Sequence, residues 1–140
     1  MTDYIIEADG GSRGNPGPAA YGTVIMNAGS GEVVAELGEF IGVATNNVAE
    51  YRGLVAALEY LAEHDPEASV VARLDSKLVV EQMSGRWKIK HPGMKELSLR
   101  ARRAFPPNQV SYEWVPRHRN KAADAIVNRC LDRAASESLS

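Results

Sequence analysis

Three runs near the N-terminus have the alternating apolar character of β-strands: residues 4–9, 20–27 and 33–41. Glycines follow the first run, and residues 27–31 between the other two consist of Asn, Ala, Gly and Ser. Because such residues favour tight turns, the pattern predicts three strands, of which the second and third form a hairpin. The first strand is expected to end at Asp9.

A helical period replaces the strand pattern after residue 45. The apolar positions recur at intervals of three and four, at Val48, Tyr51, Leu54, Val55, Leu58 and Leu61. This spacing predicts an amphipathic helix, which Asn46 or Asn47 could cap. The apolar run 69–74 then predicts a short strand that ends at Asp75, followed by a short helix from Ser76 to Met83.

The C-terminal half continues with a basic loop at 85–93 and a helix at about 94–105. Alternation at Val110, Tyr112 and Trp114 predicts a strand with one buried face. A last helix is expected from about 120 to 135, with its apolar side formed by Ala123, Ile126, Val127, Cys130, Leu131 and Ala134. The polar tail at 136–140 is expected to fray.

This order of elements predicts a single α/β domain over residues 1–135. A five-stranded mixed sheet, its first three strands antiparallel, with helices on both faces would bury all the apolar faces. The composition, 44% hydrophobic and 24% charged, is ordinary for a globular protein of this length.

Charge is unevenly divided along the chain although the net charge is only −2. Residues 1–69 hold two basic and eleven acidic residues, whereas residues 70–140 hold fourteen basic and seven acidic ones. This polarity suits a protein with a cation-binding pocket and a surface for an anionic partner, but a solvated charged face is the commoner explanation.

Other classes are disfavoured by what the sequence lacks. Cys130 is the only cysteine, which argues against a disulfide framework and a cysteine-based zinc site. The N-terminus lacks the pattern of a signal peptide, and no apolar run approaches the roughly 18 residues of a membrane span. A cytoplasmic protein without membrane association is therefore expected.

Four acids stand at element boundaries, where each has an ordinary explanation. Asp9 could shape a turn, and Asp75 could cap a helix. Glu50 has the spacing of a capping-box partner to Asn47, and Asp124 suits the first turn of a helix. Taken together, two acids at strand ends and two at helix starts could converge at the crevice outside the strand ends, where α/β sheets bind ligands.

Converging carboxylates would repel one another unless a cation offset their charge. Ligands that are all oxygen favour Mg²⁺ or Mn²⁺ over zinc. Two such ions about 4 Å apart can activate a water and stabilise the leaving oxygen in phosphodiester cleavage.

Four stretches carry these acids and their polar neighbours: residues 9–18 (DGGSRGNPGP) with Tyr21-Gly22, residues 45–50 (TNNVAE), Asp75-Ser76, and residues 114–120 (WVPRHRN) with Ala123-Asp124. In this order they resemble the four motifs of type I ribonucleases H, over nearly the whole chain. The resemblance implies the ribonuclease H-like fold.

The resemblance also implies roles for individual residues. The metal-binding acids of the family match Asp9, Glu50, Asp75 and Asp124, and two Mg²⁺ ions per site are expected, with Mn²⁺ as a substitute. The mobile histidine of the family matches His118, whose imidazole would aid proton movement or product departure. As an alternative, His118 is a solvated loop residue.

Family members bind RNA through its 2′-hydroxyls in a shallow minor groove. The matching positions here are Ser12, Asn15, Asn46 and Ser76, supplemented by backbone groups near Gly10 and Gly11, and Thr45 matches the threonine of the DNA-phosphate pocket. Asn47 lies in the same motif and is expected either to contact the substrate or to act as a turn or cap residue; Asn15 and Asn46 share this alternative.

One region departs from the longer bacterial members, which carry an extra helix and a strongly basic handle. Here only a short basic loop around Trp87 and Lys88 occupies that region. Trp87 could stack on sugars or bases while the charges meet phosphates, or it could anchor the loop in the core. The chain is similar to compact members, including the N-terminal domain of bifunctional actinobacterial proteins, and some compact members accept double-stranded RNA.

The function expected from the resemblance is endonucleolytic hydrolysis of the RNA strand of RNA/DNA hybrids, giving 5′-phosphate and 3′-hydroxyl products. The expected partner is an RNA/DNA hybrid, with double-stranded RNA as a second candidate, and the protein is expected to be a monomer. The alternatives are a non-catalytic hybrid-binding domain and an integrase-like DNA enzyme of the same fold.

Overall fold

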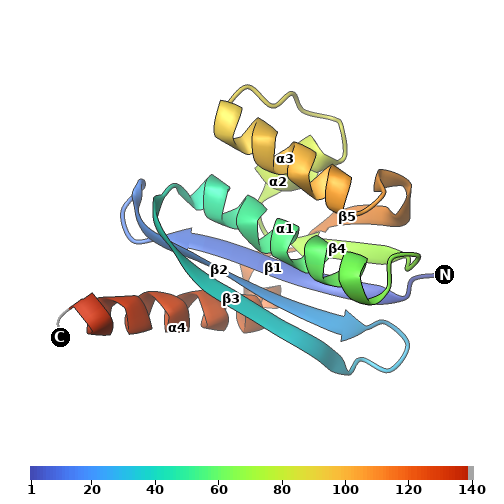
Figure 1. The fold of residues 1–140 in the computed structure, drawn as a ribbon, viewed down its shortest axis with the longest axis horizontal. Coiled ribbons are helices and arrows are strands. Elements are labelled where there is room, and N and C mark those ends of the chain that lie inside the picture. The colour runs from blue at the N-terminus through green and yellow to red at the C-terminus, as the bar shows by residue number, and fades with distance from the viewer. Residues whose placement is uncertain (139–140) are drawn as a thin grey trace.

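The computed structural model describes residues 1–138 and contains one five-stranded sheet (Figure 1). The strands are β1 (Tyr4–Ser12), β2 (Gly17–Asn27), β3 (Val33–Ala44), β4 (Val70–Leu74) and β5 (Val110–Trp114). They lie in the order β3-β2-β1-β4-β5. The pairs β1–β2 and β2–β3 are antiparallel, whereas β1–β4 and β4–β5 are parallel. The mixed sheet with three antiparallel first strands is confirmed.

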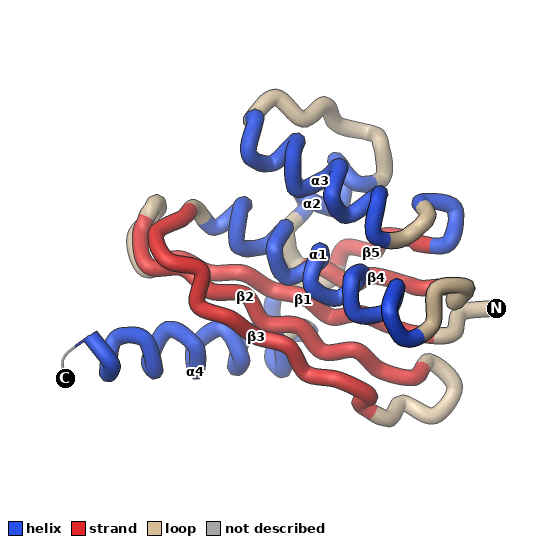
Figure 2. The backbone as a smooth tube through the Cα atoms, in the orientation of Figure 1, coloured by secondary structure: helices blue, strands red, loops and turns tan. Residues whose placement is uncertain are grey.

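Helices cover both faces of this sheet, as expected (Figures 1 and 2). They are α1 (Asn46–His64), α2 (Lys77–Met83), α3 (Pro92–Ala104) and α4 (Lys121–Ser138), with short 3₁₀ helices η1 (Pro107–Gln109) and η2 (Arg117–Arg119). Helices α1, α2 and α3 lie on one side and α4 lies alone on the other (Figure 1). None of the helices within residues 1–138 is both long enough and apolar enough to cross a membrane.

The main core lies between the sheet and α1, where the predicted apolar stripe of the helix is buried. Tyr51, Leu54 and Leu58 are fully buried there against Ile6 and Ile25. A smaller cluster on the opposite face joins α4 to β2 through Ala20, Val127 and Leu131. Burial of these apolar side chains holds α1 and α4 against the strands that carry the polar site described below.

Several boundaries differ from the sequence-based expectation. Strand β1 continues to Ser12 because Gly10, Gly11 and Ser12 pair with residues of β2. The cap of α1 is Thr45, not Asn46 or Asn47. Helix α3 begins at Pro92, inside the expected basic loop, because the His91 side chain caps it.

Two further expectations concern the C-terminal part of the chain. The predicted buried face of β5 is wrong at Trp114, the last residue of the strand, which is 49% exposed. Helix α4 runs on to Ser138 and so includes residues 136–138 of the expected tail; residues 139–140 of that tail lie outside the described residues.

Candidate active site at the ends of the parallel strands

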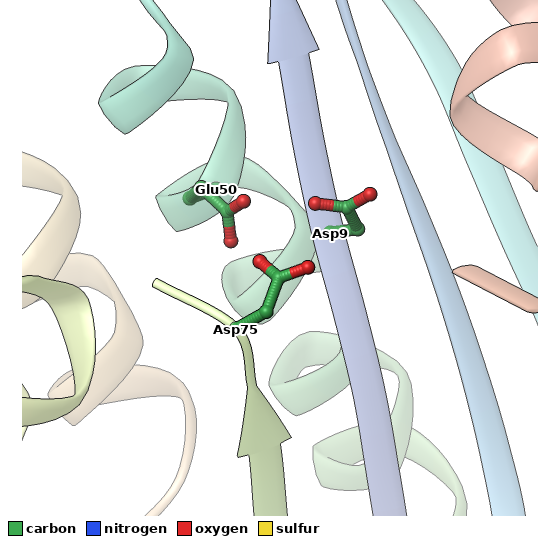
Figure 3. A group of neighbouring side chains, drawn as sticks. All are labelled: Asp9, Glu50 and Asp75. Atoms are coloured by element: carbon green, nitrogen blue, oxygen red, sulfur yellow. The ribbon is translucent and has the colours of Figure 1, made fainter. Parts of the chain in front are cut away.

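Three of the four predicted acids meet beside the central strands (Figure 3). Asp9 comes from β1, Glu50 from α1, and Asp75 from the residue after β4. One oxygen from each of these side chains lies within 4.8 Å of the other two. Figure 3 shows the three carboxylates turned toward one another. This group is called the acid cluster below.

The sheet register places Asp9 beside Asp75. Ala8 of β1 pairs with Leu74 of β4, and the two aspartates are the next residues on these parallel strands. Neighbouring strands are separated by roughly 4.8 Å, so the two side chains emerge close together.

Gly10 brings α1 close enough for Glu50 to join them. A Cβ at position 10 would lie only 2.2 Å from the Glu50 backbone nitrogen. Any larger residue would push the helix away from the strand, because contacts of this kind do not occur between real atoms. The glycine expected to approach the substrate therefore has a structural role in forming the acid cluster.

The acid cluster is buried, but its oxygens are not all satisfied. Asp9 is 2% exposed and Glu50 is 6% exposed. Asp9 Oδ1 accepts a hydrogen bond of 2.9 Å from the Gly10 amide. In contrast, Glu50 Oε2 and Asp75 Oδ2 are buried and have no hydrogen-bond partner. Leaving buried carboxylate oxygens unpaired costs free energy unless a ligand supplies the missing interaction.

The pKa values reflect this crowding. Burial raises the pKa of Asp9 to about 6; the hydrogen bond with Glu50 lowers this pKa, whereas the negative charge of Asp75 raises it further. Burial also raises the pKa of Glu50 well above its usual range, and the negative charge of Asp9 adds to that effect. A bound cation would reverse both effects, because it favours the ionised carboxylates.

The residues present therefore fit a divalent cation. The donors are all carboxylate oxygens, which hard cations such as Mg²⁺ prefer, and two of these oxygens lack any other partner.

The fourth predicted acid, Asp124, lies at the rim of the acid cluster. It is in the first turn of α4, as expected, and its interaction with Asp9 contributes to the raised pKa of that residue. It does not belong to the group whose oxygens all lie within 4.8 Å of one another. Its carboxylate accepts a weak hydrogen bond of 3.3 Å from the Asn128 amide.

Two details of the predicted acid positions are wrong. Asp9 lies inside β1, three residues before its end, and Glu50 lies in the second turn of α1. The convergence nevertheless follows, because β4 ends opposite Ala8 and exposes the side of β1 at Asp9. The capping explanations also fail, since Thr45 caps α1 and Ser76 caps α2.

Comparison with known proteins agrees with this geometry. The family model described as "Reverse transcriptase-like" matches residues 7–130. The solved N-terminal RNase H domain of Rv2228c from Mycobacterium tuberculosis is 50% identical, with a TM-score of 0.89 and 99% of both chains covered. This chain belongs to the type I ribonuclease H family.

Further relatives define the extent of the similarity. Bifunctional protein Rv2228c is 54% identical over 94% of this chain, which spans only 36% of that protein's length. RNase H1 from Halobacterium salinarum is 43% identical with a TM-score of 0.86, covering 93% of this chain and 98% of that one. LC11-RNase H1, solved in complex with an RNA/DNA hybrid, is 38% identical with a TM-score of 0.87, covering 94% and 99% of the two chains.

Three polar residues expected to contact substrate in a ribonuclease H lie together where the end of β1 meets the start of α1. The Asn46 side-chain oxygen accepts a 2.8 Å hydrogen bond from the backbone amide of Ser12, and the backbone amide of Asn46 donates to Asn15 Oδ1 at 3.0 Å. The Ser12 hydroxyl donates to the carbonyls of Gly14 and Ala44. This polar cluster joins the β1–β2 loop to the start of α1, beside the strand that carries Asp9.

The other expected contact residues have structural partners or are exposed. Thr45 and Ser76 accept capping hydrogen bonds of 3.3 Å from Val48 and Val79, and Asn47 lies in the first turn of α1 without capping it. Gly11 pairs with Ala20 of β2.

The basic loop of this ribonuclease H is exposed. Trp87 is 45% exposed and Lys88 is exposed, so the expectation that Trp87 anchors the loop in the core is wrong. His118 is exposed on η2, between β5 and α4. Both loops therefore present their side chains to solvent, where a large substrate could reach them.

Two residues at the site were given no role from the sequence. Trp114 donates a 3.1 Å hydrogen bond from its indole to the Asp75 carbonyl, and Asn120 donates one of 2.8 Å to the Ala8 carbonyl. Each residue therefore contacts the backbone at or next to an acid of the cluster. Their place in the stretch 114–120 was the only signal in the sequence, because Trp114 was expected on the buried face of a strand and Asn120 at the start of the last helix.

Proposed function

We propose that this chain is an endoribonuclease that hydrolyses the RNA strand of RNA/DNA hybrids with the help of divalent cations, Mg²⁺ first among them. The observation that carries the proposal is the acid cluster, with two buried, unpartnered carboxylate oxygens in a ribonuclease H fold. Buried carboxylates without partners destabilise a fold, so their presence here favours a role in binding cations.

The acids divide the work of the site. Asp9, Glu50 and Asp75 would hold the cations, and Asp124 would complete the ligand set from the rim. When bound, two divalent cations polarise a phosphodiester, make a water more acidic and stabilise the leaving oxygen. None of the acids becomes covalently attached to the substrate in this scheme.

Substrate recognition is proposed to begin at the polar cluster of Ser12, Asn15 and Asn46. LC11-RNase H1, a relative at 38% identity, was solved with an RNA/DNA hybrid. Hydroxyl and amide groups can both donate to and accept from a 2′-hydroxyl, which distinguishes RNA from DNA. Because these residues flank Asp9 and the start of α1, a ribose bound there would set the RNA strand against the acids.

The products are proposed to be a 5′-phosphate and a 3′-hydroxyl. Attack of water on phosphorus breaks the bond to the 3′-oxygen, and that oxygen leaves with a proton. His118, exposed next to α4, is proposed to move this proton or to aid product departure. The activity is proposed for this domain alone, since the chain spans about a third of the bifunctional relative.

Cleavage of four duplexes of one sequence tests the proposal. The end-labelled RNA strand of a hybrid is expected to be cut in Mg²⁺ and in Mn²⁺ and left intact with EDTA, whereas duplex DNA stays intact. Double-stranded RNA and a duplex with one embedded ribonucleotide define the substrate range. Asp75→Asn, shown to be folded by circular dichroism, controls for contaminating nucleases.

Three outcomes would contradict the proposal. Binding of the hybrid without cleavage in either metal would favour a non-catalytic domain. Preferential cleavage of duplex DNA would favour an integrase-like enzyme. Equal cleavage by the parent protein and Asp75→Asn would show that cleavage does not depend on the acid cluster.

A further inference from the structure

Asn120 is a polar residue with no solvent exposure, between η2 and α4. Its side-chain amide donates a 2.8 Å hydrogen bond to the carbonyl of Ala8, the residue before Asp9 in β1. β4 stops pairing with β1 at Ala8, so this bond is made where the sheet opens onto the acid cluster.

The backbone of Asn120 connects the same point to two other elements. Its carbonyl accepts a 3.1 Å hydrogen bond from the amide of Asp124, in the first turn of α4, and its amide donates at 3.0 Å to Arg117 of η2. One buried residue therefore links the strand carrying Asp9 to the helix carrying Asp124 and to the 3₁₀ helix carrying His118.

Stability alone gives a poor account of this residue. Asn120 Oδ1 is buried without any hydrogen-bond partner. An unsatisfied buried carbonyl is destabilising, which offsets much of what the bond to Ala8 contributes. Glu50 and Asp75 in the same site also have buried oxygens without partners. Unsatisfied buried polar atoms are concentrated at functional sites.

We propose that Asn120 is a positioning residue that fixes the start of α4 against β1 and so sets where the Asp124 carboxylate stands relative to Asp9. The position matters because Asp124 is the one acid that comes from the opposite face of the sheet and lies outside the tight group. The inference rests on the proposed function, because it assigns Asn120 an effect on cation binding.

The test compares Asn120→Ala and Asn120→Leu with the parent protein. The leucine variant keeps the branched shape of the side chain, slightly enlarged, but has no donor for Ala8, so it serves where the alanine variant is too unstable. Mn²⁺ binding is followed by electron paramagnetic resonance without substrate. The Mn²⁺ dissociation constant is expected to rise by about 10-fold, as for other residues that orient metal ligands. Hybrid cleavage should lose kcat with little change in KM.

A double-mutant cycle separates positioning from general destabilisation. If Asn120 acts through Asp124, Asn120→Leu should have little further effect on Mn²⁺ binding in an Asp124→Asn background. The matched control is Gln109→Leu, which also removes an amide that donates to backbone carbonyls but lies at the opposite end of the sheet. It should lower thermal stability and leave Mn²⁺ binding unchanged.

Two results would overturn the inference. One is unchanged Mn²⁺ binding in folded Asn120→Leu; the other is a loss that is equally large with and without Asp124. Because Mn²⁺ binding is measured without substrate, the result stands even if the parent protein fails to cleave hybrids, which would contradict the proposed function alone.

Discussion

Acidic residues lie at both ends of strands β1 and β4, but their hydrogen bonding differs between the two ends. At the start of these strands, Asp3 accepts a 2.8 Å hydrogen bond from the Ser69 amide, and Asp65 accepts one of 3.1 Å from the Tyr4 hydroxyl. At the other end, Glu50 and Asp75 each keep a buried oxygen without a partner.

The acids at the first end stabilise the fold, whereas the acids at the other end destabilise it. A carboxylate near solvent that accepts a hydrogen bond contributes modestly to stability and leaves nothing unsatisfied. Buried carboxylates that face one another destabilise the protein unless a cation is bound. Strands β1 and β4 therefore have a stabilising end, with Asp3 and Asp65, and a reactive end, with the acid cluster.

The largest expected effect comes from removing one charge at the reactive end. Asp9→Asn keeps the size of the side chain but removes a proposed cation ligand, so hybrid cleavage in Mg²⁺ should fall by more than about 100-fold, beyond the effect of residues that only orient ligands. Asp3→Asn, at the stabilising end, should retain most of the activity. An equal loss of activity in Asp9→Asn and Asp3→Asn, measured by hybrid cleavage, would contradict the difference between the two ends.

A smaller effect concerns pH and stability after cation removal. The folded protein holds protons on Asp9, with a pKa of about 6, and on Glu50, with a raised pKa, more tightly than the unfolded chain does. The stability that these groups contribute is present below their unfolded pKa values and is lost as pH rises through the folded ones. In EDTA, the free energy of unfolding should therefore fall by about 1–3 kcal/mol between pH 5 and pH 8.

Urea denaturation at several pH values measures this loss. The matched control is Asp9→Asn combined with Glu50→Gln, for which the loss over the same range should be much smaller. Excess Mg²⁺ should restore stability to the parent protein at pH 8 but not to the double variant. An equal pH dependence in the two proteins would show that the acid cluster is not the source.

The smallest expected effects concern one neutral donor at each end. Trp114 donates to the Asp75 carbonyl at 3.1 Å, and Gln109 donates to the Ala68 carbonyl at 2.9 Å. Trp114→Phe should weaken Mg²⁺ binding by a few-fold to about 10-fold, because it removes the hydrogen bond that holds the backbone of Asp75, a proposed ligand. Gln109→Ala should cost about 1 kcal/mol of stability and leave Mg²⁺ binding unchanged. Calorimetric titration measures Mg²⁺ affinity, and thermal unfolding measures stability. The same loss of Mg²⁺ affinity in both variants would contradict the distinction between the two ends.

The sequence by itself determined most of the fold and the identity of the acids. The alternation of residues 20–27 and 33–41 and the helical spacing from Val48 to Leu61 depend on local periodicity, which the folded protein keeps. The convergence of Asp9, Glu50 and Asp75 could be expected from element order together with the resemblance to a family.

Only the tertiary structure decided the details that depend on partners distant in sequence. Pairing with β2 extends β1 past Asp9, and the missing Cβ of Gly10 determines how closely α1 approaches. From the sequence, Asn120 has only a place at the start of the last helix, whereas in the structure its side-chain amide donates to the Ala8 carbonyl, 112 positions away. Local sequence determines periodicity and turns, whereas burial, unsatisfied oxygens and raised pKa values exist only after distant segments exclude water from one another.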